Sequence, residues 1–324
     1  MNYLAIDVGG TFIKYAVITE NCSILEKDKT PTKQDSLEIF IQSLTDICDR
    51  IKGQYEIEGI ALSMPGIIDS KKGFMYTGGS LFCIVEILEK KVGIPVTVEN
   101  DAKCAALAEI WQGSLKDCQN AIVVVCGTAV GGAVIVNREI VSGKNFMAGE
   151  FNYVITDSKD DYKMSNSLAE TAGAQALLNS VSVETGIPVE ELNGEKAFSL
   201  ANQGNDKALA GIRNHAKKLA IHIHNCQYMF DPEKIAVGGG ISEQPLLLQL
   251  IREELAKING MYPWTLPVPE VTSCRFYNDA NLIGAVYVHM KAREKKISLE
   301  KVNELMELLE NRREGEYLRA LLTE

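Results

Sequence analysis

The sequence predicts an α/β protein of two similar lobes that face a shared ligand, and three observations carry this prediction. The chain has 324 residues, more than the size at which single hydrophobic cores usually stop growing. Residues 3–18 are two apolar stretches around a Gly-Gly-Thr turn at 9–11. The same strand, Gly/Thr turn and strand return at 121–136. One such hairpin is common, but two at corresponding places indicate a duplicated domain.

The composition is acidic and otherwise ordinary for a globular protein. The chain carries 33 basic and 43 acidic residues, a formal net charge of −10, and 46% of its residues are hydrophobic. An acidic balance of this size argues against nucleic acid or a membrane surface as the main partner. The sequence enters an apolar strand at once, and no apolar run approaches transmembrane length. We therefore expect a cytoplasmic protein.

The eight cysteines and four histidines show no metal-binding spacing. No Cys-x-x-Cys pair occurs, so the thiols are expected to be reduced and mostly buried. His215, His222 and His224 fall in one predicted helix. His222 and His224 point apart, and His215 lies two turns from His222, so neither pair can share a zinc ion. The pattern predicts histidines on a partly exposed helix.

The two hairpin turns are the candidate phosphate sites. Their glycines permit positive φ, and their outward N–H groups form a concavity that suits phosphate. Asp7 ends the first strand, where an apolar run would not place a charge without a use for it. A carboxylate beside a phosphate site indicates a place for Mg²⁺.

Helices, strands and loops alternate after the first hairpin. Ser36 is expected to cap a helix through about Lys52, with apolar residues at helical spacing. A short strand at 59–63 then leads to a rigid turn at 64–69, at the end of a strand where α/β sheets tend to place ligands. A glycine-rich loop at 77–81 precedes the next helix. Simple turn chemistry explains both loops as well.

The next strand, at 95–98, delivers Glu99-Asn100-Asp101-Ala102 to the start of an alanine-rich helix. Asn100 or Asp101 can serve as the helix N-cap alone. An acidic residue at a strand-to-helix corner beside a phosphate site is equally placed as a general base or a metal ligand. The spacing leaves both alternatives open. The small residues that follow would let this helix pack closely between two lobes.

Polar residues follow the second hairpin. Glu150, Asn152 and Tyr153 stand in one loop, which leads to a polar stretch at 156–167. A helix is predicted from Ser167 to about 181, with Glu170 in its first turn. The helix dipole alone would favour a glutamate there.

Three predicted helices complete the chain. The helix at 208–230 is ended by Asp231-Pro232, and a strand at 234–237 runs into three glycines and a helix at 244–257 that Ser242 is expected to cap. Glycines between a strand and a helix favour a nucleotide, although the spacing matches neither a Walker loop nor the dinucleotide fingerprint.

A small-residue helix and a charged amphipathic tail follow. The tail is expected to pack on the chain's own surface, with a homodimer contact as the alternative.

Six motifs occur in one order and are highly specific together. They are Asp7-Val-Gly-Gly-Thr-x-x-Lys14, Met64-Pro-Gly-x-x-Asp69, Glu99-Asn-Asp-Ala102, Gly127-Thr-x-x-Gly-Gly132, Phe230-Asp-Pro and Val237-Gly-Gly-Gly-Ile-Ser242. From about residue 2 to 290 the chain resembles the ROK family of sugar kinases and repressors, within the actin, hexokinase and heat-shock ATPase superfamily. The resemblance implies two ribonuclease-H-like lobes with ATP, Mg²⁺ and a sugar in the cleft between them. The lobes are expected at 1–116, joined by a helix at 281–297, and at 117–280, with a helical tail at 298–324.

The resemblance also implies the roles of the candidate site residues. The ATP phosphates would lie against Gly9, Gly10, Thr11, Lys14, Gly127, Thr128, Gly131 and Gly132. The adenosine would be bordered by Gly238, Gly239 and Gly240. The sugar would contact Gly66, Gly79, Asn100, Asp101, Glu150, Tyr153 and Glu170. Asp7 would lie on the Mg²⁺ side, directly or through water, and Asp101 would be the base that takes the proton of the sugar hydroxyl.

This sequence departs from the family pattern at three places. Tyr153 stands where members commonly carry a histidine, and the cysteine-rich zinc cluster that usually follows is missing, so no zinc site is expected and the sugar pocket is remodelled. Ala129 replaces a frequent glycine in the second phosphate turn, and Lys103 replaces an asparagine after Asp101. The family's repressors carry a DNA-binding domain ahead of the first motif, where this sequence begins, so a repressor of that kind is not expected.

Two hypotheses from different classes remain. The first is an ATP- and Mg²⁺-dependent kinase acting on a hydroxyl, expected to be the 6-hydroxyl, of glucose, a β-glucoside, an N-acetylhexosamine or a similar sugar. The second is a non-catalytic sugar or nucleotide sensor on the same fold. The retention of Asp7, Asp101 and both phosphate turns favours the kinase.

Overall fold

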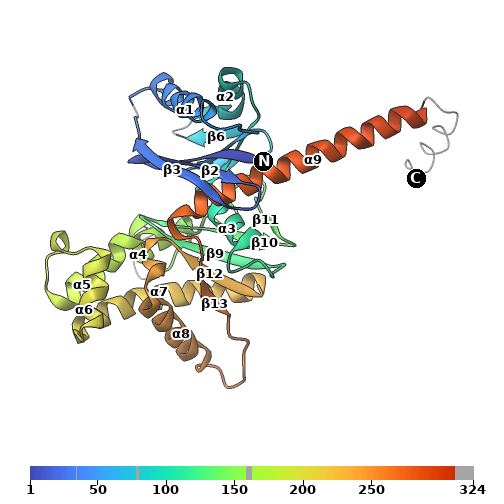
Figure 1. Ribbon diagram of the computed structural model, residues 1–324. Helices are drawn as coiled ribbons and strands as arrows, with labels where there is room; N and C mark the ends of the chain where they lie inside the picture. The colour runs from blue at the N-terminus through green and yellow to red at the C-terminus, as the bar shows by residue number, and fades with distance from the viewer. Residues whose placement is uncertain (34, 78–79, 158–162, 311–324) are drawn as a thin grey trace.

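The computed structural model describes residues 1–33, 35–77, 80–157 and 163–310, and within them it has two five-stranded sheets (Figure 1). The N-terminal sheet has the strand order β3 (Ile24–Pro31), β2 (Phe12–Thr19), β1 (Asn2–Val8), β4 (Ile60–Met64) and β8 (Val96–Asn100). The C-terminal sheet has the order β11 (Glu139–Ile140), β10 (Val130–Val136), β9 (Ala121–Cys126), β12 (Lys234–Gly238) and β13 (Val271–Ser273).

The two sheets repeat the same strand directions. β1 pairs with β2 antiparallel and with β4 parallel. In the same way, β9 pairs with β10 antiparallel and with β12 parallel. The two glycine hairpins of the sequence are β1–β2 and β9–β10, at equivalent positions of equivalent sheets. The predicted duplication is confirmed.

An outer helical layer covers the N-terminal sheet. It consists of α1 (Leu37–Lys52) and α2 (Ile84–Val92), next to a small sheet of β5 (Ile67–Asp69), β6 (Phe74–Thr77) and β7 (Ser80–Phe82). Ser36 caps α1 as predicted, because its Oγ accepts a hydrogen bond of 3.2 Å from the N–H of Ile39. Side chains alternate along a strand, so Leu4 and Ile6 of β1 join the core under these helices, while Ala5 faces the other side.

A central layer of two helices lies between the sheets. These are α3 (Asp101–Gln112) and α9 (Ala280–Glu310). Ala105 of α3 packs in one cluster with Ala5 of the N-terminal sheet, and Ala106 packs in another with Val123 of the C-terminal sheet. A Cβ at Gly284 of α9 would overlap the backbone of α3 at Cys104. The prediction that small residues let this helix pack closely between the lobes is confirmed.

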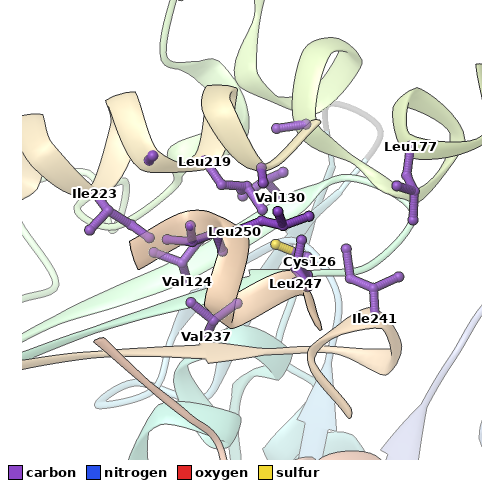
Figure 2. Packing of buried hydrophobic residues seen from close by; sticks show 14 of the residues in the cluster. Val124, Cys126, Val130, Leu177, Leu219, Ile223, Val237, Ile241, Leu247 and Leu250 are labelled. Atoms are coloured by element: carbon purple, nitrogen blue, oxygen red, sulfur yellow. The ribbon is translucent and has the colours of Figure 1, made fainter. Parts of the chain in front are cut away.

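A second outer layer covers the C-terminal sheet. Its helices are α4 (Leu168–Ala172), α5 (Ala174–Thr185), α6 (Gly194–Asn202), α7 (Asp206–Phe230) and α8 (Pro245–Asn259). Figure 2 shows the core beneath them, where Val124 and Val237 of the sheet lie in one buried cluster with Leu219 of α7 and Leu247 of α8. α7 ends at Asp231-Pro232, as the sequence predicts.

The single helix predicted from Ser167 to about 181 is two helices, α4 and α5, separated at Gly173. Gly173 is extended and lies against the backbone of Thr128, where a Cβ would overlap the carbonyl. The N–H of Ala174 donates a hydrogen bond of 2.9 Å to the carbonyl of Gly127. The helix is therefore interrupted where it meets the second glycine turn.

Two further expectations about helix ends differ from the structure. Ser242 does not cap α8: it lies in a 3₁₀ turn, Gly240–Glu243, and its hydroxyl donates to the carbonyl of Gly239 at 2.8 Å. α8 begins instead at Pro245, whose fixed φ suits a first helical position. α9 runs without a break past the boundary expected at 297, to Glu310, and leaves the body of the molecule (Figure 1). The described part of the expected tail, 298–310, continues α9 away from the body (Figure 1), against the expected packing on the chain's own surface, and 311–324 lie outside the described residues.

The cysteines and histidines are more buried than their spacing reveals. All eight cysteines are free thiols and six of them are buried, as expected. The helix that carries three of the histidines, α7, is partly exposed as expected, but His215 and His222 are buried on it. Burial lowers the pKa of each of these two to about 4, so both imidazoles are neutral at pH 7. Within the part of the chain that the structure describes, no helix is long and apolar enough to cross a membrane.

Candidate functional site

Asp7 is a buried carboxylate at the end of β1, held by two donors from other elements. Ser63, opposite Asp7 on the neighbouring strand β4, donates its hydroxyl to Oδ1 at 2.8 Å. Asn281, in the first turn of α9, donates its side-chain amide to the same oxygen at 3.0 Å. These two bonds fix the rotamer of Asp7 and engage Oδ1, so Oδ2 is the oxygen available to a ligand.

The first glycine turn follows Asp7 directly. The N–H of Gly9 closes the turn on the carbonyl of Phe12 at 3.0 Å, and a Cβ at Gly9 would stand 2.9 Å from that oxygen. Thr32 ties the turn to the end of β3 through its hydroxyl, which donates to the carbonyl of Gly9 at 2.7 Å. Gly10 and Thr11 are exposed at the tip. Lys14 stands directly opposite Asp7 in the hairpin, so both side chains lie on the same face.

The second glycine turn has the same closure. The N–H of Gly127 donates to the carbonyl of Ala129 at 2.9 Å, and Thr128 and Ala129 are exposed at the tip. A Cβ at Gly131 would come within 3.0 Å of the Cβ of Ala102. The second turn therefore lies beside the start of α3, where Asp101 is.

Asn100 and Asp101 divide the two roles that the spacing left open. Asn100 is the N-cap of α3: its Oδ1 accepts the N–H of Lys103 at 3.1 Å, and its Nδ2 donates to the carbonyl of Gly66 at 3.1 Å. The carboxylate of Asp101 accepts the N–H of its neighbour Ala102 on Oδ1 at 2.8 Å. Burial, and secondarily the charge of Asp7, raise the pKa of Asp101. A partly buried carboxylate with a raised pKa at a helix start is suited to accept a proton.

Glu99 and Glu150 add two carboxylates to this end of α3. Glu99 is buried, and its Oε1 accepts the N–H of Asn100 at 2.8 Å. Burial raises the pKa of both glutamates, and the charge of Lys103 opposes this rise in each. The charge of Asp101 also raises the pKa of Glu150, which places these two carboxylates within electrostatic reach of each other.

The three glycines expected at the adenosine lie close to the second turn. Gly239 has a φ of +88°, and a Cβ there would overlap the backbone of Cys126, the residue before Gly127. Gly238 packs against the side chain of Cys274, and Gly240 is exposed with open space around it. The expected adenosine and phosphate segments therefore adjoin.

Two residues expected to contact the sugar, Tyr153 and Glu170, are exposed at the edge of the candidate site. The side chain of Tyr153 is 64% exposed, although its N–H donates to the carbonyl of Glu150 at 3.3 Å. Glu170 is exposed in the first turn of α4, and its N–H donates a hydrogen bond to the Oγ of the N-cap Ser167. Gly79 lies outside the described residues. Glu150 and Asn100, in contrast, lie at the start of α3 with Asp101.

Sequence reasoning missed Ser63, Asn281 and Lys103 as parts of the site. Asn281 stands at the start of a small-residue helix, like Asp101, and this similarity was the available signal. Among the described residues, no group of three or more His, Cys, Asp and Glu side chains could hold a metal ion. Mg²⁺ takes most of its ligands from water and nucleotide phosphates, so a single carboxylate such as Asp7 fits it.

Comparisons with known proteins identify the relatives of this chain. Residues 3–292 match the ROK family. A beta-glucoside kinase from Klebsiella pneumoniae is 32% identical, over 89% of this chain and 95% of that protein. A glucokinase from Halalkalibacterium halodurans is 30% identical, over 93% of this chain and 98% of its own length. The crystal structure of a ROK family protein from Streptococcus pneumoniae TIGR4 in complex with sucrose superposes with a TM-score of 0.79 at 30% identity, covering 91% of this chain and all of that one. The chain belongs to the ROK family, and its two-lobed fold is the one that the family resemblance implied.

Proposed function

We propose that this protein is an ATP-dependent sugar kinase, which transfers the γ-phosphoryl group of ATP to a hydroxyl of a hexose or hexose derivative. The observation that carries the proposal is the meeting of Asp101, with its raised pKa, and the second glycine turn at the start of α3. The relatives named beta-glucoside kinase and glucokinase support this reaction class.

In this proposal Asp101 is the base. Its Oδ1 is engaged by the N–H of Ala102, so Oδ2 is the oxygen that would take the proton of the acceptor hydroxyl. Burial raises the pKa of Asp101 and so makes it a stronger proton acceptor than an exposed aspartate. Phosphoryl transfer otherwise depends on positioning and on neutralising charge.

The exposed tips of the two turns, at 10–11 and 128–129, would lie against the phosphates, and Lys14 would add a positive charge. Asp7 would hold Mg²⁺, directly or through water, and Ser63 and Asn281 would keep Asp7 oriented. When bound, Mg²⁺ neutralises negative charge on the phosphate oxygens. The glycines at 238–240 would border the adenosine.

The acceptor would lie against Asn100, Glu150 and the loop at Gly66. In this arrangement the lobe at 1–116, with α9, and the lobe at 117–280 close on the substrates and exclude water, which otherwise competes as acceptor.

The exposed ring of Tyr153 borders this site and offers a face to a group that extends beyond the first sugar ring. β-Glucosides phosphorylated at the 6-hydroxyl are therefore the first acceptors to test, followed by glucose and N-acetylhexosamines. Because the proposed reaction uses ATP, we expect a cytoplasmic enzyme. The proposed reaction requires no zinc ion.

The test is ADP release from MgATP over a panel of neutral sugars and β-glucosides, with Asp101→Asn in parallel. We expect sugar-dependent turnover in the wild type and a loss of several orders of magnitude in Asp101→Asn, with MgATP binding retained in calorimetry. Asp117→Asn, at an exposed carboxylate after α3, is the matched control and should behave as the wild type. A protein that binds sugar and MgATP but releases no ADP with any acceptor would be the sensor instead.

A further inference from the structure

Lys103 is a deeply buried cation, two residues after Asp101, that the proposed reaction does not use. Its side chain is 1% exposed, and no other lysine or arginine is buried among the side chains whose exposure the structure describes. Its ammonium donates a hydrogen bond of 2.9 Å to the carbonyl of Phe146. An ammonium has three protons to donate, and a charge in the interior is costly unless it is paired. The position therefore requires anionic or polar neighbours beyond one carbonyl.

Two carboxylates from different parts of the chain, the buried Glu99 and the partly buried Glu150, lie within electrostatic reach of this ammonium. Glu99 ends β8, and Glu150 lies in the loop that follows β11. Burial raises the pKa of each, and the charge of Lys103 lowers it. The ammonium thus favours the ionised form of both glutamates, in a place where desolvation opposes that form.

Lys103 also ties the two sides of the site together. It belongs to α3, whereas Phe146 and Glu150 belong to the segment that leads out of the C-terminal sheet. Phe146 has a φ of +61°, a left-handed conformation that a phenylalanine rarely adopts. A bond to its carbonyl from a buried side chain holds this strained loop in one arrangement. Glu150 follows a few residues later and takes its place from the same loop.

We propose that Lys103 is a positioning residue of the acceptor site, which through its bond to the carbonyl of Phe146 holds the loop of Glu150 so that this carboxylate can accept hydrogen bonds from sugar hydroxyls. The inference rests on the proposed sugar kinase function. It adds a residue that acts on the sugar acceptor and that ATP binding does not need. Lys103 acts on the acceptor through Glu150. It takes no part in the proposed binding of phosphate by the glycine turns or of Mg²⁺ by Asp7. Its removal should therefore affect the acceptor and spare the nucleotide.

The test is Lys103→Asn, which removes the charge and introduces the residue that is frequent here in the family. We expect the KM for the acceptor to rise about 10-fold or more, with the KM for ATP within about 2-fold of the wild type. Lys116→Asn, at an exposed lysine just after α3, is the matched control and should leave both constants unchanged. If Lys103 serves only the fold, its loss lowers the melting temperature and leaves the acceptor KM unchanged, which would overturn the proposal.

A double-mutant cycle with Glu150→Gln tests whether Lys103 acts through Glu150. Two residues that act as a unit give non-additive effects. The double variant should have an acceptor KM within about 2-fold of that of Glu150→Gln alone, and multiplied effects would contradict the proposal. If Lys103→Asn folds only when Glu150 is also neutral, the pairing is supported. If neither form folds, the lysine serves the fold independently of Glu150 and the proposal is wrong. A wild type without sugar-dependent turnover would instead overturn the proposed function itself.

Discussion

Asn281, in the first turn of the last helix, donates a hydrogen bond of 3.0 Å to Asp7, at the end of the first strand. This bond and the one from Ser63 converge on a single carboxylate oxygen. The orientation of Asp7 is thus set by elements from both ends of the chain. Loss of a group that orients a metal-binding side chain typically lowers metal affinity by about 10- to 100-fold.

We predict that Asn281→Leu weakens the use of Mg²⁺. The leucine keeps the approximate volume but cannot donate to Asp7, so the carboxylate loses one of its two anchors. The Mg²⁺ concentration for half-maximal activity should rise about 10-fold. Calorimetry of ADP binding with and without Mg²⁺ provides a readout besides turnover, and the contribution of Mg²⁺ to ADP affinity should shrink. Asn278→Leu, at an exposed asparagine just before α9, is the control, and equal effects of the two variants would contradict the role of Asn281.

A second prediction concerns Gly173, at the break between α4 and α5. A side chain at this position would overlap the carbonyl of Thr128, in the second glycine turn. Gly173→Ala should therefore displace the turn, raise the KM for ATP by roughly 10-fold or more and destabilise the fold by about 1–3 kcal/mol. Gly194→Ala, where a Cβ meets nothing within 4 Å, should leave the ATP constant unchanged. Steady-state kinetics and urea unfolding of both variants check this. An unchanged KM for ATP in Gly173→Ala would mean that the second glycine turn does not contribute to ATP binding.

The elements that depend on local pattern could be predicted from the sequence. Both hairpins, the cap at Ser36 and the end of α7 at Asp231-Pro232 follow from residues within one or two turns of each other. The break at Gly173 could not be predicted, because its cause is the backbone of Thr128, which is distant in sequence. The burial of His215 and His222 depends on which face of α7 meets the sheet, and the sequence of the helix alone does not decide that.

The candidate site divides in the same way. The motifs located Asp7, Asn100 and Asp101, because each stands at the end of a strand or the start of a helix, where local spacing is informative. The spacing could not assign the cap to Asn100, since both side chains can accept a backbone N–H. It also could not pair Asn281 with Asp7 or Lys103 with the carbonyl of Phe146, because these partners meet only when the two sheets enclose α3 and α9.

Asp101 gives the last prediction, in which stability and activity change in opposite directions. Burial, and secondarily Asp7, raise the pKa of Asp101 in the folded state above its value in the unfolded chain. The folded state then binds the proton more tightly, so the stabilising contribution of this group is fully present below the unfolded pKa and is lost as the pH rises through the raised pKa. Above that raised pKa the ionised, desolvated carboxylate therefore costs stability. Asp101→Asn removes that cost and should raise the melting temperature at pH 7–8 while it abolishes turnover.

The pH dependence distinguishes this cause from a general change in packing. The difference in melting temperature between Asp101→Asn and the wild type should narrow as the pH falls through the raised pKa of Asp101, because the wild-type carboxyl then becomes neutral as well. Differential scanning calorimetry between pH 4 and pH 8 measures this difference, with Asp117→Asn as the exposed control, for which no such trend is expected. If Asp101→Asn were less stable than the wild type at pH 8, the hydrogen bond from Ala102 and the N-terminus of α3 would outweigh desolvation, and the ionised carboxylate would be a stabilising group of the fold.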